Sequence, residues 1–146
     1  MKQTLAILSS LLLGTSAFAL GLSQLTLSIS TPGPDAYAGG TPVLPGETYL
    51  LVYVNKGSTF QGVQTDKTLV DSVNNTIATK AYAVAGAKCG YTPVQYSPTR
   101  FPDGGSWVIV LLDTRDASGA VGGLVAAQGV TSQKTAAADT STTLDS

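Results

Sequence analysis

The chain has 146 residues, of which 43% are hydrophobic and 12% charged, and its formal net charge is −1. Charged residues are about half as frequent as the ~25% of an average soluble domain. The chain therefore lacks the basic patch that binding to a phosphate backbone requires, and we expect no nucleic acid partner. It has no histidine and a single cysteine, which excludes a Ser-His-Asp triad and the common zinc sites. We expect no enzyme activity, no metal and no cofactor.

The N-terminal segment 1–19 has the three parts of a secretory signal peptide. Lys2 precedes an apolar run from Leu5 to Leu13, and Ala17-Phe18-Ala19 forms a small-residue cleavage motif. The apolar run is too short to cross a bilayer, because spanning takes about 20 mainly apolar residues. We therefore predict cleavage after Ala19, no membrane span in the mature protein, and a secreted, periplasmic or cell-surface location.

The segment that follows alternates apolar and polar side chains. Leu25, Leu27 and Ile29 occupy every second position, which is typical of a half-buried strand, so we place the first strand at 24–30. Residues 31–46 contain four prolines and four glycines. Neither a helix nor a central strand tolerates this composition, and we expect a long surface loop there.

Two apolar runs, 48–54 and 106–113, are the strongest strand signals in the chain. Both are rich in aromatic and β-branched residues, and glycines flank both of them. Neither run has a polar face. We therefore predict two central strands that are covered on both sides.

Strand patterns elsewhere are weaker, and they occur at 59–63, 69–73, 91–96 and 121–130. Asn74-Asn75 suits a tight hairpin, because asparagine tolerates the positive φ that such turns require. Residues 76–87 fit a strand or a helix, since Ile77, Ala81 and Val84 also have helical spacing. We favour the strand.

About seven strands with Gly, Pro and Asn turns predict an all-β domain at 20–130, with little helix once the signal peptide is removed. An antiparallel β-sandwich is the expected architecture, and a small β-barrel is the alternative. Residues 131–146 contain one large apolar side chain, so they bury too little surface to offset the entropy of ordering. We predict a disordered, low-complexity tail.

Cys89 is the single thiol of a chain that we expect to be exported. An intramolecular disulfide is therefore excluded, and the sequence leaves open whether Cys89 is buried or pairs between chains. Without a histidine partner, it is a poor candidate for a catalytic nucleophile.

Asp113 and Asp116 are the best candidates for a carboxylate pair of the kind that hydrolyses glycosidic bonds. The competing interpretation pairs Asp113 with Arg115 and places Asp116 at the start of a turn, where aspartate is favoured. We prefer the turn interpretation.

Aromatic residues supply the one pattern suited to a ligand. Rings stack on sugar faces, and the candidate binding residues are Tyr91, Tyr96, Phe101 and Trp107. The competing interpretation places Trp107 in the core, where an indole cannot reach a sugar. The sequence thus favours an exported, non-enzymatic structural or interaction protein with a partner that it does not identify. A glycan-binding module is the alternative, and a carboxylate-based hydrolase is the third candidate.

Overall fold

The computed structural model describes residues 26–29, 33–90, 92–95, 99–135 and 143–144. Its strands are β1 (Thr26–Ile29), β2 (Thr48–Val54), β3 (Asn75–Val84), β4 (Lys88–Cys89), β5 (Thr92–Gln95), β6 (Ser106–Asp113), β7 (Ala127–Thr135) and β8 (Thr143–Leu144). No helix occurs in these ranges, which confirms the all-β class for this part of the chain. Nothing in the described ranges therefore has the helical length and hydropathy needed to cross a bilayer.

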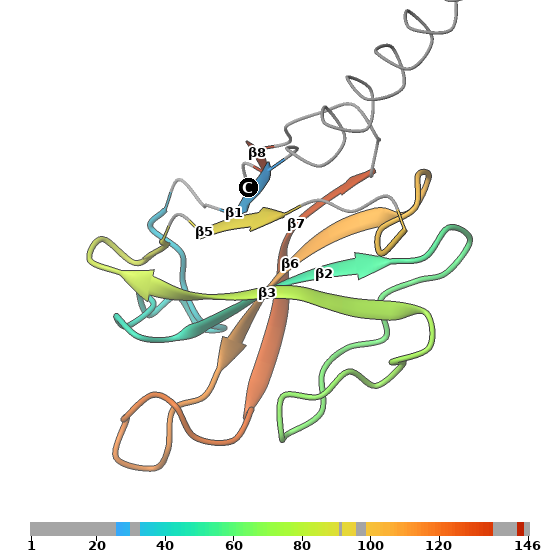
Figure 1. Ribbon diagram of the computed structural model, residues 1–146. Helices are drawn as coiled ribbons and strands as arrows, with labels where there is room; N and C mark the ends of the chain where they lie inside the picture. The colour runs from blue at the N-terminus through green and yellow to red at the C-terminus, as the bar shows by residue number, and fades with distance from the viewer. Residues whose placement is uncertain (1–25, 30–32, 91, 96–98, 136–142, 145–146) are drawn as a thin grey trace, which may run out of the picture.

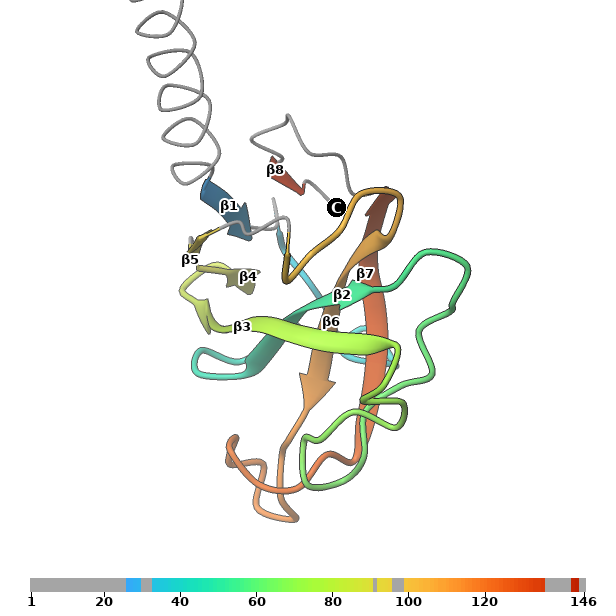
Figure 2. The ribbon, with the colours of Figure 1, turned by 45° about the vertical axis from the view of Figure 1, so that its right-hand side comes forward.

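Five strands form one curled antiparallel sheet in the order β4-β3-β2-β6-β7. Figures 1 and 2 show the curl, since β3 runs across the direction of β7 rather than alongside it. A separate three-stranded sheet has the order β5-β1-β8, and β1 pairs with β8 in parallel. The structure thus has a half-barrel of five strands, where we expected a sandwich or barrel of about seven. Strand twist curls a sheet, but residue patterns within a strand do not define how far it closes.

The two apolar runs are the central strands, as predicted. β2 lies between β3 and β6, and all seven of its residues are buried. Side chains of the two faces enter two separate clusters: Tyr49, Leu51, Tyr53, Trp107, Ile109 and Leu111 on one side, and Leu50, Val52, Val54, Val108, Val110 and Leu112 on the other. Burial of both faces explains why neither run carries a polar stripe.

Three weaker predictions are confirmed. β1 falls within the first predicted strand, β5 falls within 91–96, and the segment 76–87 is a strand up to Val84. The described part of the Pro- and Gly-rich segment, 33–46, is a loop with one isolated bridge between Ala36 and Pro42.

The strands predicted at 59–63 and 69–73 are wrong, because a single bridge between Val63 and Leu69 is the only pairing in this region of the described chain. Both side chains are buried in the second cluster, so their apolar character serves to cover the sheet rather than to build another one. The hairpin predicted at Asn74-Asn75 is also wrong, because residues 72–74 form a turn that no strand precedes and Asn75 is the first residue of β3. The Asp71 carboxylate holds this turn by accepting hydrogen bonds from the backbone N–H groups of residues 73 and 74.

The strand predicted at 121–130 starts and ends later than expected, and β8 also falls within the predicted disordered tail. β7 begins at Ala127, because residues 121–124 form bends, and it continues to Thr135. Four residues of the predicted tail, Ser132 to Thr135, therefore pair with β6, which is apolar on both faces. Residues 136–142 and 145–146 lie outside the described residues, as does the predicted signal peptide.

Candidate functional site

A groove of about 310 Å³ lies between the loop at 36–38 and the beginning of β7. Leu111 and Asp113 of β6 line it, and the register places Gly129 and Ala127 of β7 directly opposite them. A side chain at Gly129 would meet no atom within 4 Å. The groove therefore owes part of its open space to the absence of a side chain at Gly129.

The buried carboxylate of Glu47 anchors one wall of the groove. Glu47 is 0% exposed and accepts four hydrogen bonds. Thr114 donates two of them, from its backbone N–H to Oε2 at 3.0 Å and from Oγ1 to Oε1 at 2.6 Å. The others come from the Tyr37 hydroxyl at 3.2 Å and the Thr48 backbone N–H at 2.8 Å. Four donors compensate the desolvation of the charge and tie the loop to the end of β6.

An ion pair borders the same wall. The Arg115 guanidinium binds Asp113 through two bonds, Nη2 to Oδ2 at 2.7 Å and Nε to Oδ1 at 2.8 Å. It also lies 3.6 Å from the ring centroid of Tyr37, which is a cation–π contact. The Arg115 hydrogen bonds lower the pKa of Asp113, whereas burial raises the pKa of Tyr37. At neutral pH the wall therefore combines a compensated ion pair with an uncharged phenol.

Asp116 lies in an exposed turn next to this ion pair. Its Oδ1 accepts hydrogen bonds from Ser118 N at 2.8 Å, Ser118 Oγ at 2.6 Å and Ala120 N at 3.0 Å. These bonds lower the pKa of Asp116. The turn interpretation of Asp113 and Asp116 therefore matches the structure. In the described residues, no three Asp, Glu, Cys or His side chains gather as metal ligands would.

The predicted aromatic residues do not form a surface in the described part of the chain. Trp107 is 1% exposed and Phe101 is 0% exposed, and their ring centroids lie 4.9 Å apart beside Tyr53. Tyr91 and Tyr96 lie outside the described residues. Because a buried indole cannot stack on a sugar, the structure removes Trp107 and Phe101 from the candidate glycan site.

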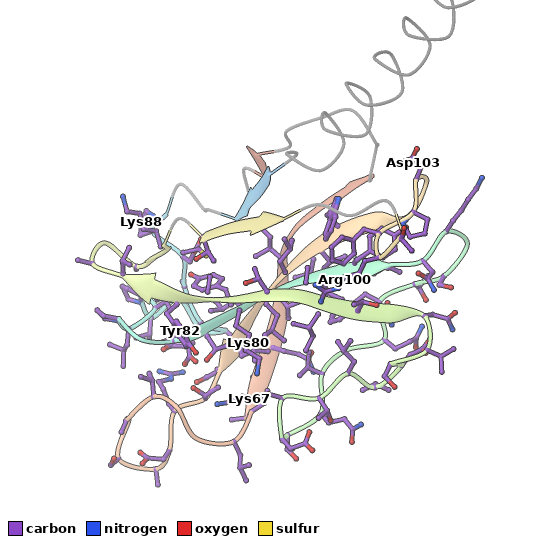
Figure 3. All side chains as sticks on the ribbon, viewed as in Figure 1. Lys67, Lys80, Tyr82, Lys88, Arg100 and Asp103 are labelled. Carbon is purple, nitrogen blue, oxygen red and sulfur yellow. The ribbon has the colours of Figure 1, made fainter. Side chains whose placement is uncertain are left out.

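Tyr82 is an exposed aromatic residue away from this cluster. It projects from β3 on the same side as Lys80 (Figure 3), and it is 57% exposed. One ring with a neighbouring ammonium does not by itself define a ligand class.

Cys89 is buried on β4, with 3% of its surface exposed. Burial raises the pKa of its thiol to about 12, so the thiolate is scarce at neutral pH. Of the two interpretations that the sequence left open, the buried thiol is the one that the structure favours.

Comparison with protein families, with curated proteins and with solved structures finds no match to this chain. The groove residues were missed because each looks ordinary in the sequence. Glu47 gave one signal, since it is an acidic residue placed directly between a Pro-Gly turn and a wholly apolar strand. Gly129 and Tyr37 gave no signal in the sequence, because their proximity in the groove depends on how the loop at 36–38 folds back over the sheet.

Proposed function

We propose that this chain is an exported, non-enzymatic structural or interaction protein that binds a partner through the groove beside β7. The observation that carries the proposal is the open groove next to an exposed strand edge. Ala127 to Val130 are all exposed, and the groove runs along them. An edge strand offers backbone N–H and C=O groups to another chain, and an adjacent hollow accommodates side chains of that chain.

The state of the carboxylates supports a binding role over hydrolysis. A glycosidase needs one carboxyl group with a raised pKa as the general acid. The pKa values of Asp113 and Asp116 are both lowered, and Glu47 has no exposed surface. Each of these groups is occupied by internal hydrogen bonds that stabilise the loops around the groove.

Burial of Trp107 and Phe101 also supports protein recognition over glycan recognition. The groove is lined mainly by small or aliphatic residues, among them Ala36, Ala38 and Leu111. Such a lining fits peptide side chains better than the faces of sugar rings, which pack on aromatic residues.

The proposed location rests on the N-terminal sequence. The cationic start, apolar run and Ala17-Phe18-Ala19 motif support export. We propose further that the half-barrel and the three-stranded sheet together constitute a small β-sandwich that presents the groove.

A photo-crosslinking amino acid at Ala127 tests the binding role in the producing cell. We expect ultraviolet light to generate a defined adduct from position 127, because this residue lines the groove. The matched control is the same amino acid at Ala120, which is also exposed but lies on the loop after β6. Equal crosslinking at the two positions, or none at either, would contradict binding at the groove.

N-terminal sequencing of the recovered protein tests export, with Leu20 as the expected first residue.

A further inference from the structure

The edge of β7 between Ala127 and Val130 is open to an added strand. β7 is the last strand of its sheet and pairs with β6 on one side. Among the described residues, the backbone of this stretch makes no hydrogen bond outside the β6 ladder, and the Gln128 side chain bonds to Val63, which belongs to the cluster on the opposite face from the groove. Because alternate residues of an antiparallel edge strand direct N–H and C=O away from their neighbour, this edge carries unused donors and acceptors.

The opposite edge of the sheet is protected. We therefore expect strand addition at the β7 edge rather than there. On β3, the Arg100 guanidinium donates a hydrogen bond to the Ile77 carbonyl at 2.9 Å, and Gly90 N–H donates to the Tyr82 carbonyl at 3.0 Å. β4 covers the end of this edge by pairing with Ala83 and Val84. A positive charge and a short covering strand are among the usual devices that block strand addition.

The groove defines what an added strand must carry. Ala127 and Gly129 are two residues apart and face the same side of the sheet as Leu111 and Asp113. A strand added to β7 would place every second side chain over this side, because side chains alternate between faces. The open space above Gly129 leaves room for a side chain there, and the internally paired Asp113–Arg115 wall offers no net charge to a ligand.

We propose that a second copy of this chain donates its N-terminal strand, β1, to the β7 edge. This inference rests on the proposed binding function and names the partner. The apolar residues Leu27 and Ile29 are two positions apart in β1, and the sequence has no charge between Lys2 and Asp35. Both features match a groove without net charge.

Release of the strand from its own copy disrupts the small sheet, of which β1 is the central strand, and breaks no pairing of the five-stranded sheet. β1 belongs to the small sheet, where it makes four residue pairs with β5 and two with β8. It has no partner in the five-stranded sheet of the described residues, so its exchange leaves the β2 and β6 core intact. Exchange of an identical element between copies is a low-cost route to an assembly.

Complementation between two variants tests this arrangement. Gly129→Leu fills the groove and leaves the donated strand unchanged, whereas Leu27→Asp places a charge in the donated strand and leaves the groove unchanged. We expect the wild-type full chain to self-associate in size-exclusion chromatography with light scattering, and each variant to associate at least about tenfold more weakly. A mixture of the two variants should form a 1:1 dimer, because one copy retains the groove and the other retains the strand. Ala120→Leu, which adds the same side chain to an exposed loop, should behave as the wild type.

A synthetic peptide with the sequence of residues 23–30 provides a second measurement that does not depend on assembly. It should bind the Leu27→Asp variant and fail to bind Gly129→Leu, with circular dichroism confirming that both variants are folded. A monomeric wild type that ignores the peptide would overturn the inference, as would a dimer that Gly129→Leu leaves unchanged. If position 127 still crosslinks to another protein in the cell while self-association fails, strand donation is wrong and the proposed binding function stands.

Discussion

The side-chain amide of Gln128 pairs with both backbone polar groups of Val63, 65 residues earlier in the chain. Val63 N–H donates to Oε1 at 2.7 Å, and Nε2 donates to the Val63 carbonyl at 2.8 Å. The amide thus satisfies both polar groups of this residue and fastens the 55–74 loop to β7. Val63 is 5% exposed, so water reaches its backbone poorly.

Substitution of Gln128 should loosen this loop. We expect Gln128→Ala to lower the free energy of unfolding by about 1–2 kcal/mol, because two backbone groups lose their partner. Gln128→Glu should cost at least as much, since a carboxylate cannot donate to the Val63 carbonyl. Denaturant titration measures both changes. Gln61→Ala, in which an exposed amide is removed, is the control and should stay within about 0.5 kcal/mol of the wild type. Equal effects at 61 and 128 would contradict the pairing.

Removal of the Glu47 carboxylate should be far more costly. Glu47→Ala leaves four donors without their acceptor, and we expect a loss of about 3 kcal/mol or more. Asp116→Asn is the control, because an amide oxygen can still accept the bonds of this exposed turn, and thermal melting should barely change. Comparable melting temperatures for the two variants would show that Glu47 does not anchor the loop.

The Cys89 thiol should be inert in the folded protein. Its pKa of about 12 and its burial leave little thiolate at pH 8. We expect a thiol reagent such as DTNB to react with the unfolded chain promptly and with the native chain at a rate limited by opening of the fold. Rapid labelling of native protein, or a disulfide-linked dimer in non-reducing electrophoresis, would contradict this assignment.

Acid should destabilise the protein through four aspartates with lowered pKa values. Hydrogen bonds from Thr68, Asn74, Arg115 and Ser118 lower the pKa values of Asp66, Asp71, Asp113 and Asp116 respectively. Because each folded-state pKa lies below the unfolded value of about 3.9, this contribution is complete well above that pH and is lost as the pH falls through the folded-state values. Denaturant titrations at neutral and acidic pH should show the loss, and Asp113→Asn should reduce it. A stability independent of pH in the acidic range would contradict the prediction.

Truncation of the chain should show how much the second half of β7 contributes to stability. A chain that stops after Val130 loses the half of β7 that pairs with Ser106 to Ile109, and its melting temperature should fall by about 5 °C or more. A chain that stops after Thr135 retains the whole β6–β7 ladder and should melt at a higher temperature than the shorter one. Identical melting of the two chains would mean that the second half of β7 adds no stability.

The sequence by itself determined the centre of the fold. β2 and β6 could be predicted because an apolar run without a polar face, bounded by glycines, has no stable place except between two neighbouring strands. The exclusion of histidine chemistry and of an internal disulfide also came from residue counts alone. These conclusions depend only on local composition, and local composition can be read from the sequence without knowledge of the fold.

The tertiary structure alone decided the site and the closure of the sheet. Glu47 meets Thr114 across 67 residues and Gln128 meets Val63 across 65, so neither pair leaves a local pattern. The same apolar character that predicted strands around Val63 and Leu69 serves instead to cover the sheet. Burial energy rewards any arrangement that removes apolar surface from water, and only the path of the connecting loops selects which arrangement forms.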